Sequence, residues 1–103
     1  MQAYFVYLLA SKPYGTLYIG VTNGLIRRVE EHRAGTASKF TAKYKVHSLV
    51  WYREYGDVTE AIQREKTMKE WPRQWKINDI ERDNPQWVDL FSMLPGVRPI
   101  KPL

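Results

Sequence analysis

Two short apolar runs open the chain, and a stretch of turn-forming residues separates them. Residues 3–10 and residues 16–22 are rich in Tyr, Val, Leu and Ile, and the gap between them holds Pro13 and Gly15. Runs of β-branched and aromatic residues that flank a Pro/Gly turn are typical of an antiparallel hairpin. We therefore expect the first two strands to pair with each other.

The pattern becomes helical directly after the hairpin. Apolar residues in the segment 24–34 recur one turn apart, as they do in a helix with one buried face. Gly35 predicts the end of this helix, because glycine readily adopts the left-handed conformation of a helix C-terminus. Thr22 or Asn23 is the expected N-terminal cap.

Further along, the chain alternates between irregular and periodic segments. Asp57 and Glu60 have the spacing of a capping box at a helix start. Pro72 follows Trp71, and the residue before a proline avoids helical geometry, so one helix ends there and another begins. These signals predict a loop at 36–47, a strand at 48–55, helices at 57–70 and 72–83, and a short final segment at 86–93.

The predicted order of elements is ββαβαα. It corresponds to a small α+β domain, in which helices flank a three-stranded antiparallel sheet. The domain is expected to cover residues 1–94. Residues 95–103 are expected to form a proline-rich C-terminal tail, which contains Pro95, Pro99 and Pro102.

Composition narrows the classes of function. The chain has 103 residues, a net charge of +5 and no cysteine, so we expect one domain without disulfides or thiolate metal ligands. The first apolar run is far shorter than the roughly 20 residues of a membrane span, and it lacks the basic start of a signal peptide. We expect a cytoplasmic protein, and the positive charge favours a polyanionic partner such as nucleic acid.

Glu65 interrupts the apolar face of the helix expected at 57–70. Burying a lone carboxylate is costly unless it is paired or binds a metal ion. One interpretation is an ion pair with Lys69, one turn later at the edge of the face. The other is a functional carboxylate that faces the sheet, and the spacing favours this second interpretation. The apolar face consists of Val58, Ala61, Ile62 and Met68.

Two tyrosines, one arginine and one histidine complete the candidate chemistry. Tyr7 and Tyr18 lie in the two strands of the hairpin, where aromatic residues are often present only for packing. Arg28 and His32 are four residues apart, so they project from one flank of the first helix. His32 also has a structural interpretation, as a partly buried imidazole near a helix C-terminus. An arginine fork matches a phosphate, and a single carboxylate such as Glu65 can hold Mg²⁺.

The ordered set of residues resembles the GIY-YIG nuclease superfamily, in particular its small, stand-alone, single-domain bacterial members. The resemblance extends over about residues 4–90. Its two signature segments correspond to residues 5–7 and 18–20, with Phe-Val in place of the Gly-Ile of the first. The positions that match the family pattern are Tyr7, Tyr18, Gly20, Arg28, His32 and Glu65.

This resemblance implies an endonuclease that uses a single divalent metal ion, Mg²⁺ or Mn²⁺. Glu65 would hold the ion, and Arg28 would bind the scissile phosphate. One of the two signature tyrosines, with His32, would activate water, and which tyrosine does so stays open. Many members also carry a later active-site asparagine, for which Asn78 and Asn84 are both candidates.

A basic and aromatic stretch within the expected loop 36–47 is a candidate for contact with DNA. Its lysines alternate with Phe40 and Tyr44, so they could neutralise phosphates while an aromatic ring stacks on a base. The rings could instead anchor the loop to the core. The expected nucleic-acid contacts are Gly20, Arg27, Lys39, Lys43, Lys45, Arg64 and Lys69.

The leading hypothesis is a metal-dependent endonuclease that hydrolyses phosphodiester bonds in DNA during repair, recombination or processing. An alternative is a nucleic-acid-binding module of the same fold with weak or no catalysis. A third is a protein-interaction domain that uses Trp71, Trp75, Trp87 and the proline-rich tail. The glutamate within the apolar face favours the enzyme, because a binding module does not need it.

Overall fold

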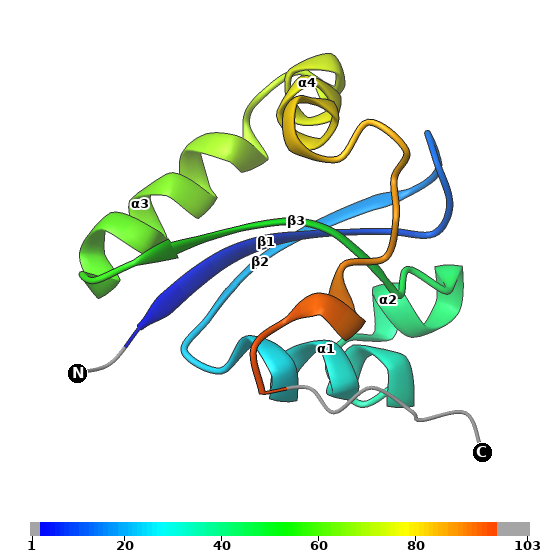
Figure 1. Cartoon of the computed structure of the whole chain (residues 1–103), viewed down its shortest axis with the longest axis horizontal. Helices are drawn as coiled ribbons and strands as arrows, with labels where there is room; N and C mark the ends of the chain where they lie inside the picture. Colours follow the sequence, from blue (N-terminus) through cyan, green and yellow to red (C-terminus); the bar gives the residue numbers. More distant parts are fainter. Residues whose placement is uncertain (1–2, 97–103) are drawn as a thin grey trace.

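The computed structural model describes residues 3–96, which form a three-stranded antiparallel sheet between two layers of helices. The strand order is β2-β1-β3, with α3 and α4 on one side of the sheet and α1 and α2 on the other (Figure 1). The elements are β1 (Tyr4–Ala10), β2 (Leu17–Thr22), α1 (Leu25–Ala34), α2 (Lys39–Tyr44), β3 (Ser48–Tyr55), α3 (Val58–Lys69), α4 (Arg73–Asp83) and a 3-10 turn (Phe91–Met93). This arrangement confirms the predicted α+β class and the initial hairpin.

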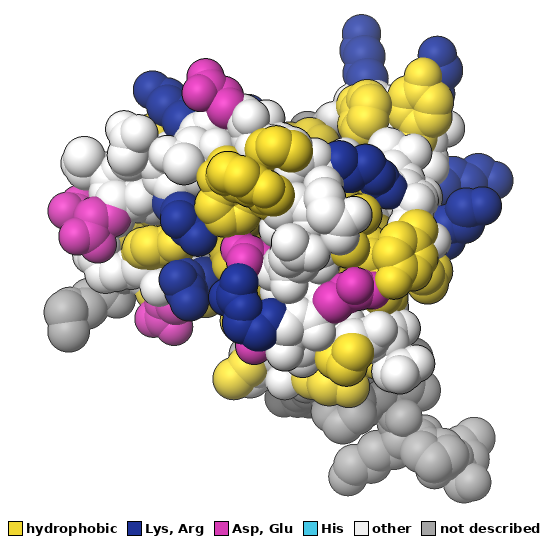
Figure 2. Space-filling view, turned by 90° about the horizontal axis from the view of Figure 1, so that it is seen from above, with side chains coloured by type: hydrophobic (Ala, Val, Ile, Leu, Met, Phe, Trp, Pro, Cys, Tyr) yellow, Lys and Arg dark blue, Asp and Glu magenta, His cyan; other side chains and the backbone are white. Residues whose placement is uncertain are grey.

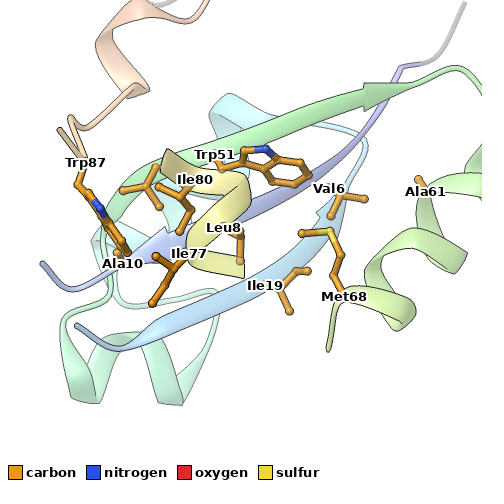
Figure 3. Close-up of a cluster of buried hydrophobic side chains, with 11 residues drawn as sticks. Val6, Leu8, Ala10, Ile19, Trp51, Ala61, Met68, Ile77, Ile80 and Trp87 are labelled. Atoms are coloured by element: carbon orange, nitrogen blue, oxygen red, sulfur yellow. The ribbon is translucent and has the colours of Figure 1, made fainter. Parts of the chain in front are cut away.

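β1 is the central strand, and its alternating side chains separate two hydrophobic clusters. Val6 and Leu8 face α3 and α4, where they share a cluster with Met68 (Figure 3). Tyr7 and Leu9 point to the opposite side and pack with residues of α1. Successive residues of a strand point to opposite faces, so Tyr7 lies on the α1 side of the sheet.

The segment 36–47 differs from the predicted loop, because it contains the short helix α2. The Ser38 side chain accepts a hydrogen bond from the backbone N–H of Thr41 (3.3 Å) and caps this helix. Thr41 is fully buried and anchors the helix to the rest of the domain. Six residues are too few to show a helical period in the sequence, so the pattern alone did not reveal α2.

Helix boundaries elsewhere follow the local signals with one exception. Gly35 ends α1 in the left-handed conformation (φ 80°), and the Asp57 side chain caps α3. The predicted side-chain cap of α1 is wrong, because Gly24 occupies that position and has no capping side chain. The Thr22 hydroxyl instead accepts a hydrogen bond from the Gly24 N–H (3.1 Å), and Asn23 pairs with Arg27. The turn is thus held by these bonds before the helix begins.

The tryptophans of the C-terminal half are not equally accessible. Trp87, one of the three tryptophans that the protein-interaction hypothesis uses, is buried, and its indole N–H donates to Glu81 (2.9 Å). Trp75 is 54% exposed and Trp71 is half-buried beside it. Trp87 therefore belongs to the core cluster and does not offer a docking surface. Of the proline-rich tail, residues 97–103 lie outside the described part of the chain.

The outer face of α3 and α4 carries basic and acidic side chains side by side, with hydrophobic side chains between them (Figure 2). Charges of both signs therefore alternate on this face, without one continuous basic surface. Among residues 3–96, no helix has the length and apolar character needed to span a membrane.

Candidate active site

The hairpin places the two signature tyrosines on one face of the sheet. Tyr7 on β1 pairs with Gly20 on β2, and Leu9 pairs with Tyr18. Since cross-strand partners share a face, Tyr7, Gly20 and Tyr18 all point toward the α1 side. The two tyrosine rings lie with centroids 6.4 Å apart.

Gly20 makes room for the phenol of Tyr7. A Cβ atom at position 20 would overlap the Oη and Cζ atoms of Tyr7. The ring of Tyr7 therefore lies directly over the glycine and extends across β2, which is an edge strand of the sheet. Gly20 acts by the absence of a side chain, and a direct contact with nucleic acid is not needed to explain it.

His32 meets both tyrosines from α1. Burial of Leu25 and Val29 fixes the face that this helix turns to the sheet, and His32 lies one turn beyond on the same side, 1% exposed. Its Nε2 atom is 2.9 Å from the Oη of Tyr7. Its ring also packs against Tyr18, with centroids 5.0 Å apart. Tyr7 and His32 thus form a buried hydrogen-bonded pair.

Burial keeps both members of this pair neutral near pH 7. The pKa of Tyr7 is raised above its usual value of 10.0, chiefly by burial and by the nearby Tyr18, while the positive charge of Arg28 opposes the shift. Burial and the charge of Arg28 lower the pKa of His32 from 6.5 to about 4. The resting site therefore contains a neutral phenol and a neutral imidazole.

Arg28 lies beside this pair with part of its guanidinium available. Its side chain is 37% exposed, and its Nε atom is 3.6 Å from a carboxylate oxygen of Glu31. Among the described residues, this buried Nε atom has no hydrogen-bond partner. The exposed part of the guanidinium, next to a phenol, is well suited to bind an anion such as phosphate.

Glu65 approaches the site from the other helical layer. Helix α3 contacts β2, the edge strand that carries Tyr18, and the Glu65 side chain is 12% exposed. The charge of Glu65 contributes to the raised pKa of Tyr7, which places the carboxylate within electrostatic reach of the phenol. Glu65 also forms an ion pair with Lys69 (2.8 Å), and this hydrogen bond raises the pKa of Lys69. The ion pair with Lys69 expected from the first interpretation is therefore present, and the functional role of Glu65 stays a prediction.

The apolar face of α3 is narrower than the sequence predicts. Ala61 and Met68 are buried, whereas Val58 is 40% and Ile62 is 39% exposed. The expected four-residue face is therefore wrong in half of its members. Glu65 remains at the boundary of the shorter face, because it lies between Ala61 and Met68 in the helical repeat.

The residues present suit one kind of metal ion better than others. Among residues 3–96, no group of three His, Cys, Asp or Glu side chains is arranged to hold a metal. Glu65 is a single carboxylate within electrostatic reach of Tyr7, and a single carboxylate fits Mg²⁺, an ion that keeps several waters and binds one or two carboxylates plus a phosphate. Lys69 is 54% exposed, so its ammonium can move into water when a cation approaches.

The basic residues expected to contact nucleic acid do not all lie together. Lys39, Lys43 and Lys45 are exposed on or beside α2, near Tyr18 through its contact with Phe40 (6.3 Å between centroids). Arg64 lies elsewhere: it stacks on Trp71 and pairs with the buried Asp79. The structure therefore gathers the α2 lysines near the tyrosines and leaves Arg64 in a separate cluster. Arg27 is exposed on α1, and Lys69 is bound to Glu65.

The two candidate asparagines have different surroundings. The Asn84 amide donates to the carbonyl groups of Val50 and Val88, and its oxygen accepts from the Val88 N–H. Asn84 therefore ties the end of α4 to β3 and has a structural role. Asn78 is exposed and accepts a hydrogen bond from Gln74 on the same helix.

Thr41 is a residue of the site that the sequence did not single out. Its hydroxyl oxygen is 2.8 Å from the Nδ1 of His32, on the opposite side of the ring from Tyr7. Ser38 was the one signal for it, since a serine is a preferred N-terminal cap of a helix. Without α2, the sequence gives no reason to bring Thr41 to His32.

Comparison with known proteins assigns the class. Residues 3–78 match the family described as the GIY-YIG catalytic domain, and the chain belongs to this family. The UPF0213 proteins of Staphylococcus aureus strains Mu3 and Mu50 are each 33% identical to it over 81 residues, which cover 79% of this chain and 98% of the relative. A UPF0213 protein from Bacillus halodurans, solved by solution NMR, shares the fold with a TM-score of 0.54 and 23% identity, over 88% of this chain and 96% of that one.

Proposed function

We propose that this protein is a metal-dependent endonuclease that hydrolyses phosphodiester bonds in DNA. Membership of the GIY-YIG catalytic domain family supports a nuclease-type domain that acts on nucleic acid. The observation that carries the proposal is the buried hydrogen bond between Tyr7 and His32; the charges of Arg28 and Glu65 both act on Tyr7, and that of Arg28 also acts on His32. Packing alone does not require a tyrosine–histidine pair between an arginine and a glutamate.

In this proposal, Tyr7 receives a proton from the attacking water. The proposal requires the phenol to donate its own hydrogen to the Nε2 of His32, 2.9 Å away, so that its oxygen lone pairs face away from the imidazole. A neutral phenol is a weak base, so the two transfers occur together: the water proton moves to Oη as the phenol proton moves to Nε2. The water oxygen then bonds to phosphorus, the bond to the leaving oxygen breaks, and that oxygen takes a proton from solvent. His32 releases the proton that it accepted back to solvent, which restores the neutral pair. Tyr18 packs against His32 and holds its ring in place.

Arg28 would bind the phosphate that is attacked. Its guanidinium offers donors to the non-bridging oxygens, where negative charge develops during the reaction. Removing such an electrostatic contact typically costs about 3–4 kcal/mol in the transition state, which corresponds to a rate loss of about 10²- to 10³-fold. The same positive charge also favours the phenolate character that Tyr7 gains during the transfer.

Glu65 would hold Mg²⁺ or Mn²⁺. A bound divalent ion would supply Lewis-acid stabilisation of the phosphate and of the leaving oxygen. The ion pair with Lys69 would open when the cation binds, since the Lys69 side chain already lies largely in water. The proposal places this activity where bacterial DNA lies, in the cytoplasm, and assigns it to repair, recombination or DNA processing.

One observation favours the alternative of a nucleic-acid-binding module with little catalysis. The Glu65 carboxylate is already satisfied by Lys69 at 2.8 Å. An ion pair that persists in the presence of Mg²⁺ would leave the protein with a basic surface and no metal site. The two functions therefore differ in whether a cation displaces Lys69.

The deciding experiment is a cleavage assay with Mg²⁺ or Mn²⁺ on supercoiled, nicked, flapped and branched DNA. We expect cleavage by the wild-type protein, loss of cleavage with EDTA, and recovery when Mg²⁺ is added back. Glu65→Ala and Arg28→Ala should each lower kcat by about 10²-fold or more. The matched controls are Glu60→Ala, an exposed glutamate of the same helix, and Arg53→Ala, an exposed arginine of β3.

Each outcome separates the two functions. Activity that survives Glu65→Ala would remove the metal assignment, and this variant should fold, since alanine favours helices and Lys69 is left in water. Binding of DNA that weakens with salt, without cleavage of any substrate, would support the binding module. Equal losses in the two control variants would show that the effects are not specific to the site.

A further inference from the structure

We infer that Thr41 is a positioning residue for His32: its hydroxyl fixes the imidazole in the tautomer with hydrogen on Nδ1, so that Nε2 accepts the hydrogen of Tyr7. This inference rests on the proposed function, because it concerns the proton acceptor of the same site. Thr41 lies on α2, the short helix that the sequence pattern did not predict.

The hydrogen bonds around Thr41 determine which atom carries each hydrogen. The Thr41 hydroxyl donates to the backbone carbonyl of Ser38 (3.2 Å). A hydroxyl has one hydrogen, so toward the Nδ1 of His32, at 2.8 Å, the same oxygen acts as acceptor. When the hydroxyl hydrogen goes to Ser38 in this way, Nδ1 carries the imidazole hydrogen, and Nε2 is left as an acceptor for Tyr7 at 2.9 Å. In this arrangement the hydrogens of Tyr7, His32 and Thr41 all have partners.

The opposite tautomer leaves one hydrogen without a partner. If Nε2 carried the hydrogen, it would donate to the Oη of Tyr7, and the phenol hydrogen would need another acceptor. Among residues 3–96, His32 is the one hydrogen-bond partner of the Tyr7 hydroxyl, and Tyr7 is 2% exposed. A buried hydroxyl without a partner is costly. Thr41 and Tyr7 therefore favour the same tautomer from the two sides of the ring.

Burial makes this selection effective. Thr41 is 0% exposed and His32 is 1% exposed, so water does not compete for these bonds. In the inferred arrangement Tyr7 donates to His32, His32 donates to Thr41, and Thr41 donates to the carbonyl group of Ser38. Loss of the Thr41 hydroxyl would remove the acceptor for Nδ1–H and would allow the imidazole to take the other tautomer, in which Nε2 no longer accepts the phenol hydrogen.

The tautomer can be measured directly by a two-bond ¹H–¹⁵N correlation spectrum of the uniformly ¹⁵N-labelled, full-length protein. The chain has two histidines, and a His47→Gln variant assigns the signals of His32. We expect hydrogen on Nδ1 in the wild-type protein, a shift toward hydrogen on Nε2 in Thr41→Val, and the wild-type pattern in Thr41→Ser. Valine matches the shape of threonine without its hydroxyl, and serine restores the hydroxyl.

Cleavage kinetics provide the second measurement. Thr41→Val should lower kcat by about 100-fold with little change in KM, within the range that general acid–base groups contribute, and Thr41→Ser should recover most of this loss. Thr22→Val is the matched control, because Thr22 is also buried but its hydroxyl bonds to the backbone of Gly24. We expect it to lower stability without a change in the His32 tautomer.

Three results would overturn the inference: hydrogen on Nε2 in the wild-type protein, a wild-type tautomer and kcat in Thr41→Val, or no recovery with Thr41→Ser. If Thr41→Val does not fold, the wild-type spectrum and Thr41→Ser still decide. If the wild-type protein cleaves no DNA, the proposed function fails, and the spectra alone decide the role of Thr41.

Discussion

At the scale of single residues, the candidate site depends on a position that has no side chain. The phenol of Tyr7 reaches His32 only because it can lie over Gly20, where a Cβ atom would overlap it. The same contact explains why a glycine follows the second signature tyrosine by two positions on the strand. The pairing of Tyr7 with Gly20 across the hairpin converts a sequence signature into the geometry of a buried tyrosine–histidine pair.

Gly20→Ala should therefore move Tyr7 away from His32. The extra methyl group has to displace a buried ring, and overpacking of this kind costs about 1–3 kcal/mol of unfolding free energy. Urea denaturation measures this loss. Gly56→Ala is the control, because a Cβ atom there meets no atom within 4 Å, and its change should stay within about 0.5 kcal/mol. Equal stability of the two variants would contradict the close packing of Tyr7 on Gly20.

At the scale of elements, α2 shows what the sequence pattern can and cannot reveal. The strands and the longer helices were predictable, because their apolar residues recur with a clear period. Local signals also mark helix boundaries: Gly35 ends α1, and Asp57 and Pro72 precede the first residues of α3 and α4. α2 has one and a half turns and a single buried residue, Thr41. Local periodicity is absent in so short a helix, so its contact with His32 appears only in the folded structure.

α2 also carries the exposed lysines that we expect to bind DNA. Lys39 and Lys43 lie on this helix beside Phe40, whose ring contacts Tyr18. If each lysine neutralises one phosphate, the double variant Lys39→Ala/Lys43→Ala should reduce the slope of log K against log salt by about 1.8 on duplex DNA. Fluorescence anisotropy with labelled DNA at several salt concentrations measures this slope.

The control for these lysines removes the same charge elsewhere. Lys12 lies at the tip of the hairpin and Lys66 lies on α3, and both are exposed. Lys12→Ala/Lys66→Ala should leave most of the slope unchanged. Slopes that fall equally in both double variants would indicate that the net charge, and not α2, determines DNA binding.

At the scale of the whole molecule, the site joins two layers on opposite sides of one sheet. Glu65 was predictable as an exception to the apolar pattern of its helix, although Val58 and Ile62 proved to be exposed. Its proximity to the tyrosines was not predictable from that pattern, because it depends on how α3 packs against the edge strand β2. Long-range packing of this kind is decided by the fold as a whole, and in the sequence only the family resemblance pointed to it.

The hydrophobic cluster on the α1 side of the sheet also includes a residue near the end of the described chain. Leu94 is 5% exposed and belongs to the same hydrophobic cluster as Tyr7 and Leu9. Leu94→Ala should therefore lower the unfolding free energy by about 2 kcal/mol or more, as for other buried leucines, and urea denaturation measures it. Met93→Ala is the control, since the Met93 side chain, next to Leu94 in the chain, is 65% exposed. If both variants have wild-type stability, this segment does not contribute to the core, and the cluster around Tyr7 is closed without it.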